Sequence, residues 1–248
     1  INAWAYIDPD YAMKQARARD AEPRRSALHG VPIGIKDIID TMDMPTGHGS
    51  SIYAGDRPGR DSACVAAFRA AGMVILGKTA TTEFASPYPV GTRNPHDIER
   101  TPGVSSSGSG AAVADFHVPY ANGTQTGGSV IGPAAYCGVY GYKASLNGLD
   151  RGGIRHCKPS IDTLGLFSRS IDDLILLRAV SVGQPERNSQ RADTPRVGVC
   201  RTQYGDKAEP CMQAAIERAA TLLTKSGATV EDIDLPNEVI EAEPNFEV

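Results

Sequence analysis

Residues 123–135 constrain this chain more than any other stretch, because they place one serine, Ser129, directly after two glycines. Glycines let the backbone bend sharply and leave bare N–H groups beside that serine. Pro133 can open a helix just beyond it. A serine at such a loop–helix junction has what a nucleophile with an oxyanion hole requires. A glycine-rich loop with a capping hydroxyl explains the same residues equally well.

Lys36 interrupts an apolar run, residues 31–40, that we expect to form a short buried strand. A lysine in such surroundings loses proton affinity, because desolvation penalises its charged form. An uncharged lysine can act as a base. The alternative is a lysine that reaches solvent or pairs with Asp37 or Asp40.

A hydroxyl-rich segment, residues 101–110, precedes a run of small apolar residues and predicts the start of a helix. A strand expected over residues 118–122 would carry the chain from this segment straight to Ser129. A serine-rich N-cap loop is the alternative interpretation. No GxSxG motif surrounds these serines, which excludes the nucleophile elbow of the α/β-hydrolases.

Strands and helices are expected to alternate along the chain, which favours an α/β layer fold. Asp61 is expected to cap the helix over residues 62–71. Residues 147–165 are expected to be irregular. Residues 184–195 are expected to be exposed to solvent. Residues 72–79 match the phosphate-loop pattern GxxxxGK[ST], but the residues between the two glycines are themselves an apolar strand, so we expect no nucleotide site. The expected helices are residues 8–22, 62–71, 172–182 and 210–225, and the expected strands are 31–40, 73–76, 118–122, 196–200 and 228–233.

Composition narrows the function classes. The net charge of −4 gives no basic excess for nucleic acid or an anionic membrane, and no apolar run reaches membrane-spanning length. The five cysteines are irregularly spaced and include no CxxC pair, which favours a reduced, cytoplasmic protein. The five histidines show no ligand spacing, so we expect no metal and no cofactor.

Three segments in a fixed order, residues 34–37, 105–109 and 123–135, together resemble the amidase signature family. The sequence of residues 123–135 is most similar to the malonamidase-like branch of that family. Weaker matches lie between and after them, and the resemblance runs from about Leu28 to Leu177. It implies a Ser–cis-Ser–Lys triad in which the peptide bond between Val104 and Ser105 is cis. The site residues that it implies are Ser129 as nucleophile, Ser105 as bridging serine and Lys36 as base; the backbone N–H groups of Thr126, Gly127, Gly128 and Ser129 as oxyanion hole; and Ser106, Gly132 and Cys137 as substrate contacts.

The resemblance also implies a fold. It is a three-layer α/β/α arrangement with a mixed central sheet, in a single domain over residues 1–248 whose catalytic core is about 28–177. Because family members are usually much longer, we expect the fold to be incomplete in this chain.

The implied activity is that of an amidohydrolase, which cleaves a carboxamide C–N bond through an acyl-serine intermediate. Two departures from the family pattern bear on it: Val104 stands where the family has glycine, and Ile131 or Gly132 where it has an arginine that pairs with a substrate carboxylate. We therefore expect a neutral or apolar primary amide as substrate, with a homodimer as one possible assembly. The alternatives are the glutamine amidase component of a tRNA amidotransferase, and a truncated pseudoenzyme or binding protein with the same fold.

Overall fold

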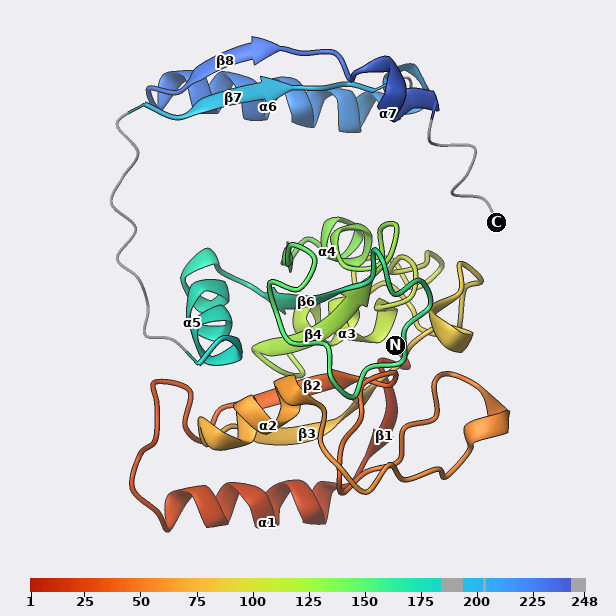
Figure 1. Ribbon diagram of the computed structural model, residues 1–248, viewed down its shortest axis with the longest axis vertical. Coiled ribbons are helices and arrows are strands. Elements are labelled where there is room, and N and C mark those ends of the chain that lie inside the picture. The colour runs from red at the N-terminus through yellow and green to blue at the C-terminus, as the bar shows by residue number, and fades with distance from the viewer. Residues whose placement is uncertain (184–193, 203, 242–248) are drawn as a thin grey trace. The chain divides into compact units, whose positions relative to one another are not determined.

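The computed structural model describes residues 1–183, 194–202 and 204–241 (Figure 1). These residues fall into two compact units, Ile1–Glu186 and Arg187–Val248, which we describe separately. The single domain expected over residues 1–248 stays a prediction. Among the helices that the structure describes, none has the length and apolar character needed to cross a bilayer.

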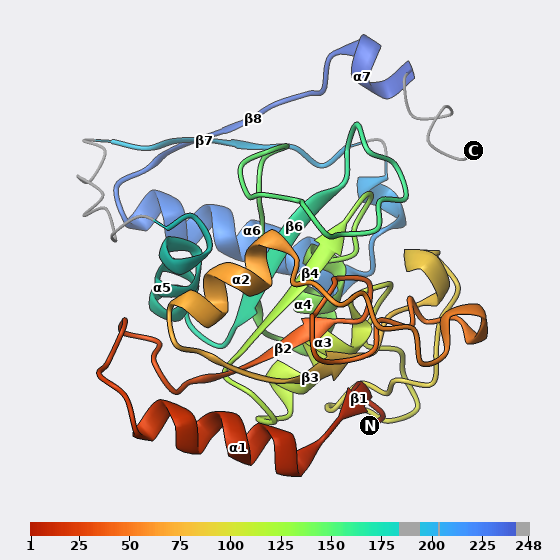
Figure 2. The same ribbon diagram turned by 60° about the horizontal axis from the view of Figure 1, so that its bottom comes forward.

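The first unit is built on a six-stranded mixed sheet, which runs through its middle in Figure 2. Three adjacent strands, β3, β2 and β4, are parallel, whereas β1, β6 and β5 each run antiparallel to a neighbour. The mixed sheet and its helices confirm the expected α/β class. In the order of the sheet, the strands are β1 (Trp4–Ile7), β3 (Val74–Thr79), β2 (Pro32–Lys36), β4 (Tyr120–Gln125), β6 (Thr163–Ser168) and β5 (Tyr140–Lys143).

Helices cover both faces of this sheet. One core packs α2 (Ala63–Ala70) and α5 (Ile171–Ser181) against Ile33 and Ile35, and the other packs α3 (Ser107–Ala114) and α4 (Ile131–Cys137) against Ala121. Successive strand residues point to opposite faces. Lys36 therefore points with Gly34 toward the α3 side, away from the isoleucine core.

Helix α1 (Pro9–Asp20) lies along the first half of β3, which β1 leaves unpaired. β1 pairs only with the second half of β3, so Ile75 lacks a strand partner on that side. The amide of Gln15 takes its place, accepting from the Ile75 N–H over 3.2 Å and donating to its carbonyl over 2.9 Å. A side chain thus covers a sheet edge that would otherwise be open.

Several expected boundaries need correction. Ser62, not Asp61, caps α2, because its hydroxyl reaches the Val65 N–H while Asp61 binds the Met42 N–H and Arg69. The expected irregular region ends earlier than residue 165, since β6 begins at Thr163 and pairs with β4. Most of the expected exposed segment, residues 184–193, lies outside the described residues.

The short 3-10 turns are η1 (Ser51–Tyr53), η2 (Glu83–Ala85) and η3 (Gly205–Lys207).

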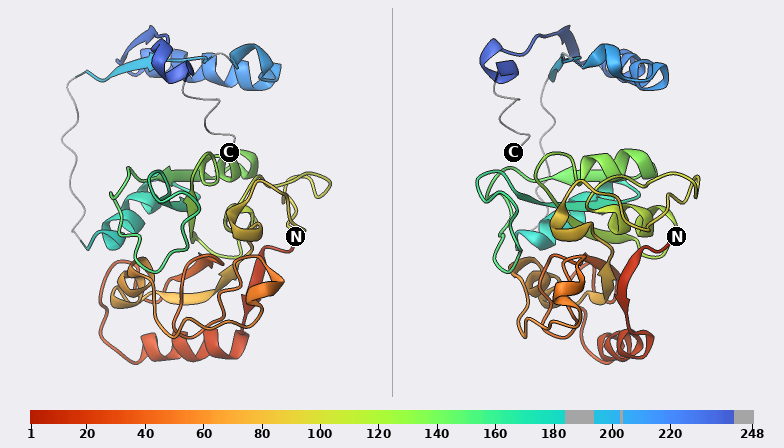
Figure 3. Two further views of the ribbon diagram at one scale, coloured as in Figure 1. Left: turned by 45° about the vertical axis from the view of Figure 1, so that its right-hand side comes forward. Right: turned by 90° about the vertical axis from the view of Figure 1, so that its right-hand side faces the viewer.

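The second unit contains a small strand–helix–strand arrangement (Figure 3). β7 (Arg196–Val199) and β8 (Thr229–Asp232) form a parallel pair, and α6 (Pro210–Lys225) connects them. Gly227, at a φ of +93°, turns the chain from the helix into β8. The sequence predicts these three elements, and a short helix α7 (Asn237–Glu241) follows them.

Candidate active site

Lys36 lies where two neighbouring strands separate. β2 and β4 pair at Ile33 and Gly34 and diverge beyond them. The Lys36 N–H therefore finds no ladder partner on β4 and donates instead to the side-chain Oδ1 of Asn122 over 3.0 Å. The Lys36 side chain reaches the segment that precedes α3, where Ser105 lies.

The Lys36 amine is fully buried among hydroxyl and carbonyl oxygens. Its Nζ lies 2.7 Å from Ser105 Oγ and donates to Thr124 Oγ1 over 2.9 Å and to the Thr124 carbonyl over 3.4 Å. Burial lowers the pKa of Lys36 to about 7, against the opposing attraction of Asp162. A substantial share of Lys36 is therefore uncharged at neutral pH, as a base requires.

Asp37, which follows Lys36 in the sequence, forms its ion pair with a different lysine. Asp37 lies 3.4 Å from Nζ of Lys78, which also donates to Thr46 Oγ1 over 2.6 Å. Lys36 thus forms no ion pair with Asp37 or Asp40, and neither alternative expected for this lysine holds. Lys78 is a strand residue of β3, which also excludes a phosphate loop at residues 72–79.

Ser105 is buried just before α3, and the peptide bond that joins it to Val104 is trans. The cis bond that the family resemblance implies is thus absent. A trans bond is favoured by about 3–4 kcal/mol where no proline follows. The chain instead turns at Gly103, whose φ of +105° suits glycine and where a Cβ would lie only 3.0 Å from the backbone of Pro133 in α4.

Residues 126–129 connect β4 to α4 and carry the expected oxyanion hole. The Gln125 side chain accepts from the N–H groups of Val130 and Ile131, over 2.8 and 3.0 Å, and so caps α4. The N–H groups of Thr126, Gly127, Gly128 and Ser129 have no acceptor among the described residues. A Cβ at Gly127 or Gly128 would meet nothing within 4 Å, so there is open space beside both glycines of the loop.

Ser129 is half-buried at the end of this loop. In the described part of the chain, no hydrogen bond reaches its hydroxyl. The structure therefore brings Lys36 and Ser105 together, but the link from Ser105 to Ser129 is not closed. Catalytic hydrogen bonds are often open in structures without substrate.

The three expected substrate contacts lie in different surroundings. Ser106 is fully buried and donates to the Thr124 carbonyl over 3.2 Å, and Cys137 is buried with its thiol toward the Pro102 carbonyl. Burial also raises the pKa of Cys137 to about 12. Both side chains are thus engaged inside the protein, and the substrate contacts expected of them stay a prediction. Gly132, at the start of α4, is half-buried, and a Cβ there would lie in ordinary contact, 3.9 Å, with the Val104 side chain.

Two residues of the site were not identified from the sequence. Thr124 is the second hydroxyl on the Lys36 amine, and Asn122 is the acceptor for the Lys36 N–H. A signal existed, since three polar side chains follow one another at alternate positions, 122, 124 and 126, in what the sequence predicts as a strand and the loop beyond it. Among the described residues, no group of three or more His, Cys, Asp or Glu side chains could hold a metal ion.

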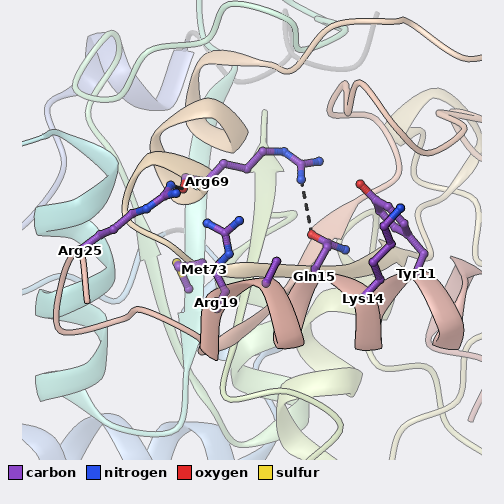
Figure 4. Close-up of a pocket in the computed structure, with 8 residues that line it drawn as sticks. Tyr11, Lys14, Gln15, Arg19, Arg25, Arg69 and Met73 are labelled. Carbon is purple, nitrogen blue, oxygen red and sulfur yellow. Dashed lines mark hydrogen bonds between the residues drawn. The ribbon is translucent and has the colours of Figure 1, made fainter. Parts of the chain in front are cut away.

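A hollow of about 330 Å³ between α1 and α2 contains none of these residues (Figure 4). Arg69 projects into it from α2, and Lys14, Gln15 and Arg19 line it from α1. Its arginines are already paired, Arg69 with Asp43 and Asp61, and Arg19 and Arg25 with Glu22. We assign this hollow to the packing of α1.

Comparison with known proteins gives a match to one family model and to several relatives. The family model described as Amidase matches residues 1–244. A glutamyl-tRNA(Gln) amidotransferase subunit from Acidothermus cellulolyticus is 38% identical over 263 residues, covering 96% of this chain and 52% of the relative. The corresponding protein of Chloroflexus aggregans is 37% identical, covering 96% and 54%. The chain thus spans about half the length of the curated relatives that it matches.

Solved structures show the same pattern. The peptide amidase from Stenotrophomonas maltophilia is 33% identical with a TM-score of 0.83, covering 98% of this chain and 56% of that chain. A glutamyl-tRNA(Gln) amidotransferase subunit from Thermotoga maritima is 28% identical with a TM-score of 0.78, covering 95% and 55%.

Proposed function

Because the chain belongs to the amidase family, we propose that it hydrolyses a carboxamide by two-step acyl transfer, with Ser129 as nucleophile. The observation that carries this proposal is the buried contact of 2.7 Å between Lys36 Nζ and Ser105 Oγ. A serine hydroxyl is a poor nucleophile until a base takes its proton. A lysine whose pKa is about 7 is uncharged often enough to do so near neutrality.

Each proton has a defined place in the proposed reaction. Ser129 Oγ attacks the amide carbonyl carbon, its proton passes to Ser105 Oγ, and the Ser105 proton passes to Lys36 Nζ. The negative oxygen that forms is stabilised by the free N–H groups of residues 126–129. The tetrahedral intermediate then collapses, the C–N bond breaks, and the leaving nitrogen takes up the proton. Water attacks the acyl–Ser129 ester by the same path and releases the acid.

We further propose a neutral or apolar primary amide as the substrate. Ile131 or Gly132 stands where the malonamidase-like branch, which this loop resembles, has an arginine, and the Ile131 side chain is 46% exposed at the start of α4. An apolar side chain there offers no bidentate partner to a substrate carboxylate. Primary amides of acetamide or benzamide type are therefore favoured over malonamate.

The test is ammonia release over a panel of such amides, with wild type beside Ser129→Ala. We expect turnover by the wild type and its loss in the variant. Equal rates for the two proteins would remove the nucleophile assignment. A clear preference for malonamate would remove the substrate assignment while leaving the reaction in place.

A second candidate is the glutamine amidase component of a tRNA amidotransferase, which the identity of 37–38% with the two named amidotransferase proteins favours. Release of ammonia from glutamine, stimulated by partner proteins, distinguishes it from a free-standing amidase. The third is a pseudoenzyme, which the open link between Ser105 and Ser129 motivates. Failure of Ser129 to react with a fluorophosphonate would identify it.

A further inference from the structure

Asp162 is a buried carboxylate that no step of the proposed reaction uses. It lies directly before β6 and is 6% exposed. One carboxylate oxygen accepts from the Thr126 hydroxyl. The other accepts from the backbone N–H groups of Cys157 and Lys158, over 2.6 and 2.8 Å. Both oxygens are thus held by hydrogen bonds, which is typical of a carboxylate kept charged in the interior.

These contacts place Asp162 beside both halves of the site. Thr126 opens the oxyanion loop, so the carboxylate holds that loop at its first residue. On the other side, a hollow of about 10 Å³ separates Asp162 from Thr124, which accepts from the Lys36 amine. The register of β4 and β6 fixes this arrangement, since Thr163 pairs with Gln125.

We infer that Asp162 is a positioning residue of the proposed amidase reaction, whose carboxylate holds Thr126 at the head of the oxyanion loop and presents a negative charge to the buried Lys36 amine. This inference rests on the proposed function. It divides into a mechanical part, carried by the hydrogen bond to Thr126, and an electrostatic part, carried by the charge. The two parts can be separated by substitution.

The electrostatic part has a defined sign. Burial lowers the pKa of Lys36, and the attraction of Asp162 opposes that fall. Other charged or titratable groups face Asp162: Arg151 donates to its backbone carbonyl over 2.8 Å, His156 Nδ1 lies 3.8 Å from its carboxylate, and Arg155 lines the same small hollow. Lys78 and Asp37, next to Lys36 along the sheet, pair with each other. If Asp162 lost its charge, the Lys36 amine would lose a proton at lower pH.

The test uses the full chain and a fluorophosphonate probe. Ser129 Oγ forms a bond to phosphorus, fluoride leaves, and the serine proton moves toward Lys36, so the labelling rate reports on the uncharged lysine without any amide substrate. Labelling is measured from pH 5 to 9, and mass spectrometry identifies the labelled residue. The variants are Asp162→Asn, which removes the charge but keeps an acceptor oxygen, and Thr126→Val, which removes the hydroxyl but keeps the charge. Asp172→Asn, exposed on α5, is the matched control.

We expect the labelling midpoint of Asp162→Asn to fall by about one pH unit, at the low end of what a nearby opposite charge produces. Thr126→Val should keep the wild-type midpoint but reach a plateau rate at least several-fold lower, and Asp172→Asn should match the wild type. A merely structural Asp162 would lower the melting temperature and leave the midpoint unchanged, which would overturn the electrostatic part.

The remaining outcomes are also decisive. A wild-type plateau in a folded Thr126→Val overturns the mechanical part, and this holds even when Asp162→Asn does not fold. Absence of label on wild-type Ser129 overturns the proposed function, and this inference with it. Label on wild-type Ser129 with an unshifted Asp162→Asn overturns only the role of the charge.

Discussion

The Nζ atom of Lys36 lies 2.7 Å from Oγ of Ser105, in a place that water does not reach. The contact joins the end of β2 to the segment before α3, 69 residues further along the chain. A lysine normally extends its charge into solvent. Here its amine is held by two hydroxyls, from Ser105 and Thr124, and its proton affinity is reduced by burial.

The first prediction concerns the pH dependence of turnover. Because the pKa of Lys36 is lowered to about 7 and its uncharged form is the base, activity should rise with pH through about 7 and then level off. Lys36→Arg, which stays charged, should lose about 10²- to 10⁴-fold in kcat. Initial rates of ammonia release from pH 5 to 10 provide the measurement. An ascending limb centred near 10 would show that an ordinary lysine is titrating.

The second prediction concerns stability. The pKa of Lys36 is about 7 in the folded protein and 10.5 ordinarily, so between these values the unfolded chain binds the extra proton. The free energy of unfolding should therefore rise with pH across this window, by up to about 1.4 kcal/mol per pH unit from this group alone. Below pH 7 both states are protonated and the full destabilisation remains.

Lys36→Met should abolish that contribution and be more stable than wild type at pH 7. Urea unfolding of both proteins at pH 7, 8 and 9, followed by the fluorescence of Trp4, the single tryptophan, measures the difference. The difference in the free energy of unfolding between the two proteins should become smaller as pH rises. A gap that is independent of pH would contradict the linkage.

The third prediction concerns the buried pair of Lys78 and Asp37. Burial lowers the pKa of Lys78 to about 8 and raises that of Asp37, and for both groups it outweighs their mutual attraction. Replacing one partner leaves the other charged and alone, so Lys78→Met and Asp37→Asn should each cost about 3–5 kcal/mol at pH 7. The double variant should lose much less than the sum, as urea unfolding can measure. Additive losses would mean that the two side chains do not interact.

The fourth prediction concerns specificity. Ile131→Arg places a guanidinium at the exposed start of α4, where a substrate carboxylate could accept two hydrogen bonds. The ratio of kcat/KM for malonamate over acetamide should rise by about tenfold or more, since a charged hydrogen bond contributes about 1.5–3 kcal/mol. Ile131→Met, of similar length and without charge, is the control. An equal change in both variants would exclude recognition of the carboxylate.

Local patterns predicted most of the fold. The helix at α6 has the expected bounds, residues 210–225, because proline, an apolar stripe and a closing glycine mark it in the sequence alone. The cap of α2 was assigned wrongly because Asp61 and Ser62 are both good N-caps. Tertiary contacts decide between them, because the Asp61 carboxylate accepts hydrogen bonds from the Met42 N–H and from Arg69 and so is not available as a cap.

For the proposed site, the sequence indicates candidate residues more than their geometry. Motif order pointed to Lys36, Ser105 and Ser129, and burial of Lys36 was one of two interpretations of the apolar run around it. The partner of Asp37 could not be expected, since Lys78 reaches it only because β2 and β3 are neighbours in the sheet. The bond from Asp162 to Thr126 likewise depends on the pairing of β4 with β6.

The end of pairing between β2 and β4 has a consequence for how such a protein can evolve. Where two strands stay paired, the backbone dictates their spacing and no side chain can alter it. Beyond Gly34 that spacing depends on two side chains of β4, because Asn122 binds the Lys36 N–H and Thr124 binds the Lys36 amine. Substitutions at these two positions can therefore change how far the amine stands from the strand that leads to Ser129, while the paired part of the sheet stays as it is.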